Sequence, residues 1–276
     1  MSFDYEKSVW GKKEAGRGIS DPSAFRLYQS KRVWGRLPAG ARVLEVGCGA
    51  GQFIRAVKRA RPDLECFACD VSSLALDVAK GLGGGVNYKL SDPDRLPFDK
   101  KEFDAVLVFD VLEHVSDAKI LLKEINRVLK LGGLFYSYVP CEGDFLSVWK
   151  YLNVFSFFRR LTEKYAGHIN RLSRRQWKKN IFSSGFILSS SRYSEHLFGQ
   201  ILNLVTFVAL DNFARNHIGQ QINNEYFFAN LDKSRHATFL KFLKRAVNSA
   251  VYCESYALQL LPSPNWHMIW VKEISL

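Results

Sequence analysis

Short apolar segments alternate with amphipathic segments in a strict order between residues 42 and 139. Strands that alternate with helices predict βαβ units, in which neighbouring strands run parallel. The apolar run FDAVLVF at 103–109 is typical of a strand that is covered on both faces of a sheet. The predicted strands lie at 42–46, 64–70, 86–90, 103–109 and 134–139, and the predicted helices lie at 52–61, 72–80 and 118–129.

Two local signals indicate where these helices begin and end. Ser72 is a candidate N-cap, because its hydroxyl can accept a backbone N–H of the first turn. The sequence LKLGG lies at the end of the segment 118–129, and we expect Gly132 and Gly133 to supply the C-terminal stop of that helix.

The pattern changes after Pro140. Segments at 185–193 and 265–274 are predicted strands, and residues 196–261 between them are mostly helical. We therefore predict an α/β fold with a seven-stranded, mostly parallel sheet, helices on both faces and a helical insertion between the last two strands. The predicted units are a helical cap at 1–40, a core at 41–195 and 262–276, and the insertion at 196–261.

Composition limits the class of protein. Hydrophobic residues at 47% and charged residues at 24% exclude wholesale disorder. The five cysteines are odd in number and irregular in spacing, so no disulfide framework is expected. Cys66 and Cys69 lie three apart on a predicted strand, point to opposite faces and are expected to pack in the core. A polar start and the absence of a spanning apolar run predict a soluble, cytoplasmic protein.

A glycine-rich loop follows the first predicted strand at 47–51, before the first helix. Closely spaced glycines let the backbone turn tightly and approach a ligand, and the following helix offers free N–H groups. The dinucleotide pattern G-x-G-x-x-G fails, because position 52 is Gln52. The loop therefore predicts a binding site of another kind.

The motif Glu-x-Gly-x-Gly-x-Gly at 45–51 resembles motif I of class I S-adenosylmethionine-dependent methyltransferases. The rest of the stretch agrees in order, with Asp70 ending the second strand, the series SDP, LPF and FDAV at 91–106, DVLEHV at 110–115 and RVLKLGG at 127–133. This series is similar to the ubiquinone/menaquinone-methyltransferase-like branch, the type 11 domain, over roughly residues 40–140. The resemblance implies a Rossmann-like fold and methyl transfer.

The resemblance also implies S-adenosylmethionine as cofactor and S-adenosylhomocysteine as product. Asp70 would accept both ribose hydroxyls, and Asp92 would accept the adenine amine. Pro93 departs from the family pattern, because it lacks the N–H that often contacts adenine. The implied cofactor-binding residues are Glu45, Gly47, Cys48, Gly49, Gly51, Asp70, Val71, Asp92 and Phe109.

Three residues are candidates for catalysis. His168 lies in a G-H segment that resembles one beside the acceptor pocket of relatives, and it would act as base or orient the acceptor. His114 belongs to the LEHV pattern, where a structural role competes with that of a base. Asp110 ends the fourth strand, at the edge where open α/β sheets bind ligands. No cluster with metal-ligand spacing appears along the sequence, so no metal is expected.

The net charge of +12 is concentrated after residue 141, where Arg159, Arg160 and Lys164 follow an aromatic run and more cations follow at 171–179. Such a surface can dock on an anionic membrane, bind a nucleic acid or simply remain exposed to solvent. The apolar insertion favours a lipid partner over a nucleic acid. Alternatively, it lines an acceptor pocket, acts as a lid or forms a homodimer contact.

The sequence therefore predicts methylation of a small molecule that is hydrophobic, lipid-linked or glycan-linked. Oxygen is the expected methylated atom only because O-methylation is common among such enzymes. The alternatives are a non-catalytic adenosyl-binding scaffold and an RNA or DNA methyltransferase. The motif that would support the latter is missing after 103–109, where DVLE stands.

Overall fold

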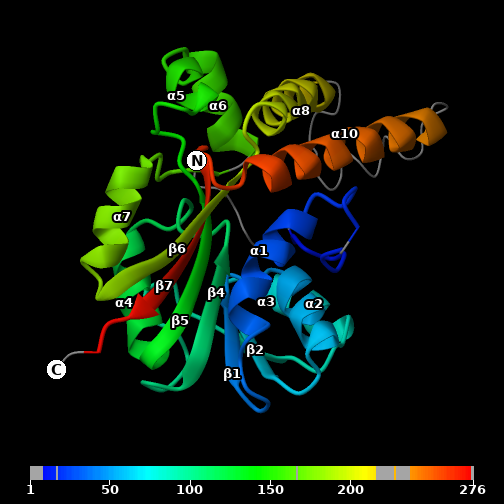
Figure 1. Cartoon of the computed structure of the whole chain (residues 1–276). Coiled ribbons are helices and arrows are strands. Elements are labelled where there is room, and N and C mark those ends of the chain that lie inside the picture. The colour runs from blue at the N-terminus through cyan, green and yellow to red at the C-terminus, as the bar shows by residue number, and fades with distance from the viewer. Residues whose placement is uncertain (1–8, 17, 166, 216–226, 228–236, 275–276) are drawn as a thin grey trace.

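A seven-stranded sheet forms the centre of the computed structural model, which describes residues 9–16, 18–165, 167–215, 227 and 237–274 (Figure 1). The strand order is β3-β2-β1-β4-β5-β7-β6. Strand β7 runs antiparallel to both of its neighbours, and the other pairs are parallel. The strands are β1 (Arg42–Val46), β2 (Glu65–Asp70), β3 (Asn87–Leu90), β4 (Phe103–Phe109), β5 (Leu129–Pro140), β6 (Phe186–Ser194) and β7 (Asn265–Lys272).

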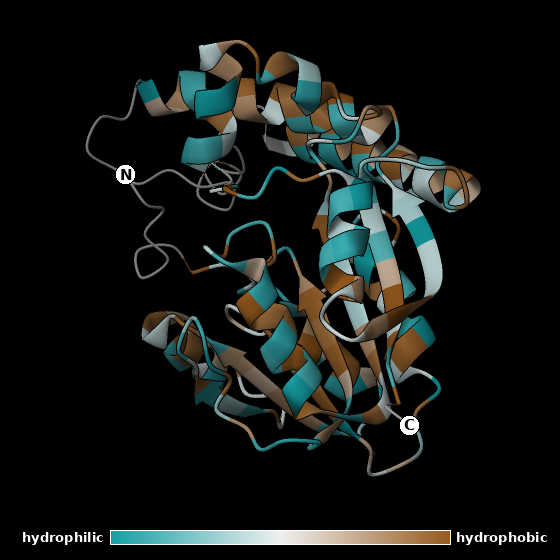
Figure 2. Ribbon diagram, turned by 90° about the vertical axis from the view of Figure 1, so that its left-hand side faces the viewer, coloured by the Kyte–Doolittle hydropathy of each residue, from teal (hydrophilic) through white to brown (hydrophobic). Residues whose placement is uncertain are grey.

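Helices cover both faces of the sheet and bury two apolar cores (Figure 1). Helices α1 (Ala24–Trp34), α2 (Gln52–Ala60) and α3 (Ser73–Gly81) contribute to one core, and α4 (Ala118–Val128) and α7 (Arg174–Phe182) contribute to the other. Figure 2 shows the inner strands mostly in brown, as expected for strands covered on both sides. The predicted α/β class, the mostly parallel sheet and the helices between its last two strands are confirmed.

Ser72 and the two cysteines of β2 lie as the sequence predicted. Ser72 caps α3, because its hydroxyl accepts the N–H of Ala75 at 3.1 Å. Cys66 belongs to the core under α2, whereas Cys69 belongs to the core under α4, so the C-x-x-C pair faces opposite sides of the sheet. Both thiols are buried and free.

The predicted end of α4 is wrong. The helix ends at Val128, and β5 begins at once with Leu129, which pairs with Phe103. Gly132 therefore lies within β5 at a φ of +71° instead of stopping the helix. The register between β4 and β5 shifts after the first pair, because the residues around Gly132 bulge out of the ladder. A glycine signals a left-handed residue, but it does not tell a helix cap from a bulge.

Four further helices lie together at one end of the sheet (Figure 1). They are α5 (Val148–Leu152), α6 (Ser156–Tyr165), α8 (Phe198–Arg215) and α10 (Ala237–Leu258). None of the helices in the described ranges is long and apolar enough to cross a membrane. Parts of the predicted cap and insertion, at 1–8, 17, 216–226 and 228–236, lie outside the described residues.

Candidate functional site

The glycine loop between β1 and α2 has a backbone that side chains would obstruct. Gly47, Gly49 and Gly51 have φ values of +71°, +51° and +78°. A Cβ at Gly47 would meet Val111 at 2.4 Å, and one at Gly49 would meet the carbonyl oxygen of Trp10 at 2.7 Å. Only glycine combines these angles with so little space.

Two carboxylates at strand ends hold the loop. Glu45 on β1 is buried, and its Oε2 accepts the N–H of Ile54 in the first turn of α2 at 2.7 Å. Asp70 ends β2, and its two oxygens accept the N–H of Gly49 at 2.7 Å and that of Ser72 at 2.9 Å. Burial raises the pKa of Glu45 to about 8. The sequence placed both acids at the loop, and the structure gives each of them a backbone partner.

The N-terminal segment crosses the glycine loop. The N–H of Ala50 donates to the carbonyl of Trp10 at 2.8 Å. The guanidinium of Arg55 on α2 donates to the carbonyls of Gly11 and Lys12 at 3.0 and 2.9 Å. Trp10 and Gly11 thereby reach the wall of the cavity beside the loop.

One cavity of about 570 Å³ runs along the carboxyl ends of β1, β2 and β4. The candidate cofactor-binding residues and the candidate catalytic residues all line this cavity except Gly51. Gly51 occupies the N-cap position of α2. The predicted residues in its wall are Glu45, Gly47, Cys48, Gly49, Asp70, Val71, Asp92, Phe109, Asp110, His114 and His168.

These residues differ in burial. Val71, Asp92 and Pro93 are exposed at the rim. Phe109 is buried and stacks on Phe53, with ring centroids 4.0 Å apart. Cys48 is also buried, and burial holds the pKa of its thiol well above the usual range.

Asp110 lies in a left-handed conformation with a φ of +51°, which is costly for a residue with a side chain. Its carboxylate pairs with Arg26 of α1 at 3.0 Å. Arg26 also lies 3.6 Å from Glu195 and stacks over the ring of Tyr138 at 4.3 Å. Burial raises the pKa of Asp110, although Arg26 opposes this shift.

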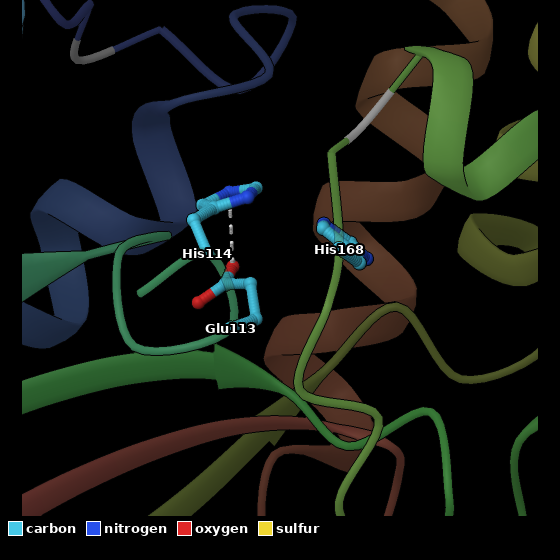
Figure 3. Close-up of side chains that lie close together, drawn as sticks. All are labelled: Glu113, His114 and His168. Atoms are coloured by element: carbon cyan, nitrogen blue, oxygen red, sulfur yellow. Dashed lines mark ion pairs between the residues drawn. The ribbon is translucent and has the colours of Figure 1, made fainter. Parts of the chain in front are cut away.

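Two histidines face each other across the cavity with a buried glutamate beside them (Figure 3). The rings of His114 and His168 have centroids 5.0 Å apart. Glu113 is fully buried, and its Oε1 lies 3.8 Å from Nε2 of His114. The Nδ1 of His168 donates to Oε1 of Glu142 at 2.5 Å.

Burial, assisted by the charge of His168, lowers the pKa of His114 to about 3. Burial alone would lower the pKa of His168, but the hydrogen bond to Glu142 and the carboxylates of Glu113 and Asp110 outweigh it and raise that pKa. Burial raises the pKa of Glu113 to about 8.

Sequence reasoning missed several polar residues of this end of the cavity. Arg26 and Glu195 are far from the motifs along the chain, and Tyr138 lies in the strand that follows the last of them. Glu113 is part of the DVLEHV segment, and its position beside His114 is the one signal that pointed to it. Arg26, Tyr138 and Glu195 meet only because the start of α1 and the ends of β5 and β6 lie at one place.

Residues 44–137 match a family model described as a methyltransferase domain. Over 98 residues the chain is 34% identical to the ubiquinone/menaquinone biosynthesis C-methyltransferase of Desulfotalea psychrophila, covering 35% of this chain and 40% of that protein. Over 148 residues it is 29% identical to the ubiquinone biosynthesis O-methyltransferase of Coxiella burnetii, covering 51% and 62%. The chain thus spans about half the length of these curated relatives.

Solved structures share the fold at low identity. The [4+2]-cyclase SpnF superposes with a TM-score of 0.59 at 18% identity, over 94% of this chain and 84% of that one. Phosphoethanolamine N-methyltransferase 2 of Haemonchus contortus, in complex with S-adenosylhomocysteine, has a TM-score of 0.58 at 20% identity, over 92% and 54%. A cyclase among these neighbours means that the fold alone does not assign the reaction.

Proposed function

We propose that this chain, whose residues 44–137 form a class I, S-adenosylmethionine-dependent methyltransferase domain, methylates an oxygen of a hydrophobic or lipid- or glycan-linked small molecule. The observation that carries the proposal is the single cavity shared by the glycine loop and the two histidines. In the reaction the acceptor oxygen bonds to the methyl carbon, the C–S bond breaks with its electron pair on sulfur, and the hydroxyl proton leaves.

At the cofactor end, Asp70 is the residue that would hold the ribose. Its carboxylate lies in the wall of the cavity, and a carboxylate can accept from two adjacent ribose hydroxyls. Glu45 serves the site by ordering α2, since its carboxylate accepts the N–H of Ile54. Asp92 at the rim is open to an adenine amine.

At the acceptor end, the sulfonium methyl is already electrophilic, so alignment and a proton acceptor are the remaining needs. His168 acts as base or orients the acceptor oxygen, with His114 opposite it and Asp110 beside it. Arg26 fixes the carboxylate of Asp110 from the cap.

The insertion at 196–261 completes the acceptor pocket in this proposal. Asn203 and Phe207 of α8 and Tyr165 of α6 line the cavity. Phe207 packs against Trp149 in a separate apolar cluster, which supports a hydrophobic acceptor. In this proposal the chain consists of a cap at 1–40, a core at 41–195 and 262–276, and this insertion.

An anionic membrane surface is part of the proposal. Tyr151, Val154 and Phe155 are exposed, and Val154 reaches 82%. Arg159 and Arg160 follow on α6 and are exposed as well. Apolar side chains beside cations suit the boundary of an anionic bilayer.

Part of the predicted basic surface is neutralised within the fold. Lys164 lies 3.7 Å from Asp211. Arg171 lies 3.3 Å from Glu163, and Arg174 lies 2.8 Å from Asp144. The proposed membrane contact uses Arg159, Arg160 and the aromatic residues before them, whereas Arg175, Lys178 and Lys179 are exposed on α7.

The test is mass spectrometry of the lipid and glycan fractions of cells with and without the gene. We expect species heavier by one CH₂ group only where the gene is present. Calorimetry with S-adenosylmethionine separates the rivals, because a scaffold that binds the cofactor without turnover gives a binding signal and no methylated product. Absence of both would refute the proposal.

A further inference from the structure

We propose that Glu142 is a positioning residue for the transfer: its buried carboxylate holds the ring of His168 in the tautomer that can take a proton from the acceptor. This inference rests on the proposed function, in which His168 meets the acceptor oxygen. No motif in the sequence indicated Glu142, because it lies 26 residues before His168, on a different segment.

The contact between these two side chains is short and buried. Nδ1 of His168 lies 2.5 Å from Oε1 of Glu142, and the two side chains are 15% and 5% exposed. An ionised carboxylate can only accept, so the hydrogen of this bond is on Nδ1. Nε2 is then the ring nitrogen that can accept a proton. His168 lines the cavity and Glu142 does not, so the carboxylate acts on the ring from outside the acceptor space.

The turn that carries Glu142 is fixed by its neighbours. It follows β5 directly, and the N–H of Cys141 donates to the carbonyl of Pro264 at 2.7 Å. A Cβ at Gly143 would meet the carbonyl oxygen of Arg171 at 2.6 Å, so this turn packs closely against the segment after His168. The carboxylate is therefore held against the ring by the backbone on either side of it.

The segment that carries His168 is fixed as well. The N–H groups of Ile169 and Asn170 both donate to the carbonyl of Glu113, at 3.0 and 2.9 Å. The side-chain amide of Asn170 donates to the carbonyl of Val115 at 2.7 Å. Since the backbone is held here, the remaining freedom of His168 is rotation of its side chain, and the bond to Glu142 restricts that rotation.

The second oxygen of Glu142 makes a weaker contact. Oε2 lies 3.4 Å from Nε of Arg171, and neither atom has a hydrogen-bond partner among the described residues. Nη2 of Arg171 lies 3.3 Å from Glu163, which is exposed. Arg171 thus offsets part of the charge of Glu142, while the short hydrogen bond goes to His168. Glu163 shares Arg171 with Glu142 and serves as the matched control below.

The ionisable groups that face His168 come from two places. Glu142 lies after β5, whereas Asp110, Glu113 and His114 lie at the end of β4 and in the turn behind it (Figure 3). Burial lowers the pKa of His168, but the hydrogen bond to Glu142 and the charges of the three carboxylates outweigh burial and raise this pKa. The surroundings therefore stabilise the protonated ring.

These contacts give the proton of the proposed reaction a defined path. The acceptor hydroxyl gives its proton to Nε2 of His168 as its oxygen bonds to the methyl carbon. The C–S bond breaks with its electron pair on the sulfur of S-adenosylhomocysteine. The imidazolium donates from Nδ1 to Glu142, whose charge stabilises it, as the acid of a catalytic triad does. The proton then passes from Nε2 to solvent.

The test uses the full chain with nitrogen-15-labelled histidine, because the shifts of the ring nitrogens report the tautomer and the protonation of an imidazole. His168→Gln assigns the resonances of His168 by their loss. In the unaltered chain we expect Nδ1 of His168 to stay protonated while Nε2 titrates. In Glu142→Gln the midpoint of that titration should fall by about 1–3 pH units, the range for an opposite charge in contact.

Glu163→Gln removes the other acid beside Arg171 and should leave the tautomer and the midpoint of His168 unchanged. A midpoint in Glu142→Gln equal to that of the unaltered chain overturns the positioning role. If Glu142→Gln fails to fold, Glu142→Asp replaces it, because this variant keeps the charge and withdraws it by one methylene. Its midpoint should fall by a smaller amount, and no fall overturns the role.

Turnover supplies the second readout. About 10⁴-fold is lost when the acid behind a triad histidine becomes its amide, so cells with Glu142→Gln should form the methylated product slower by roughly tenfold or more. Affinity for S-adenosylmethionine should stay unchanged in calorimetry. Equal product formation by Glu142→Gln and Glu163→Gln contradicts the positioning role. Absence of product with the unaltered gene contradicts the proposed function instead, so the two failures are distinguishable.

Discussion

The cofactor end of the cavity comes mainly from one continuous stretch, residues 45–92, to which Trp10, Gly11 and Phe109 add, whereas the acceptor end gathers side chains from across the chain. Gly47 and Asp70 act through backbone geometry at the first end. At the second end Arg26 joins Asp110 and Glu195, which lie on different strand ends. Backbone conformation in the glycine loop therefore determines the cofactor end, whereas ion pairs between distant segments determine the acceptor end.

The two ends also differ in what a substitution should do. A change in the glycine loop alters the shape of the backbone that receives the cofactor. A change among the charged residues leaves that backbone intact and alters the chemistry. The comparison predicts that binding of S-adenosylmethionine and turnover can be lost independently.

The largest effect is expected for His168→Ala. If the ring takes the proton of the acceptor hydroxyl, turnover should fall by about 10²–10⁴-fold, the typical contribution of a positioned acid–base group. Affinity for S-adenosylmethionine should stay nearly unchanged, since His168 lies at the acceptor end. Turnover is followed on the acceptor identified by mass spectrometry. A folded variant with unaltered turnover at every pH would assign His168 a purely structural role.

Gly47→Ala is the next largest. The new Cβ would meet Val111 at 2.4 Å while φ stays at +71°. Overpacking and strain together should lower the free energy of unfolding by about 2–4 kcal/mol. Gly40→Ala is the matched control, because Gly40 has a φ of +76° and open space around it. That variant should lose only about 1–2 kcal/mol. Equal losses in urea unfolding would mean that crowding at the loop is unimportant.

Asp70→Ala should weaken S-adenosylmethionine binding by about 1.5–3 kcal/mol, the usual range for charged hydrogen bonds. Asp92→Ala should cost less, because Asp92 is exposed at the rim. Calorimetry measures the affinity of both variants for S-adenosylmethionine. Unchanged affinity in folded Asp70→Ala would rule out the ribose assignment.

The smallest effect concerns the outer surface of the acceptor end. Each cation near an anionic membrane contributes about 1 kcal/mol, so Arg159 and Arg160 together contribute about 2 kcal/mol. Liposome sedimentation with anionic lipid should show binding that high salt reduces but does not abolish, because the aromatic residues add a salt-insensitive part.

Reversing both charges, Arg159→Glu with Arg160→Glu, should release the chain without changing its affinity for S-adenosylmethionine. The same reversal at Lys31 and Lys100, which are exposed on other elements, is the control. If the unaltered chain stays in the supernatant at low salt, the basic surface is only solvated.

The sequence by itself determined the sheet and the cofactor end. Apolar patterns placed all seven strands, with errors confined to their ends. The signal is strongest for the inner strands β1 and β4, because burial on both faces requires apolar runs, whereas β3 is mostly exposed. The glycines at 47–51 predicted the tight loop, since a positive φ is a local demand that glycine meets most readily. The lack of room for a Cβ comes from Val111 and Trp10, and only the tertiary structure shows it.

The tertiary structure alone decided how the acceptor end is arranged. The pair Arg26–Asp110 and the bond from His168 to Glu142 join segments that no spacing rule connects. It also decided which cations are neutralised, as with Arg174 beside Asp144. A side chain's partner depends on where elements meet in space, and that meeting is set by the packing of the whole core.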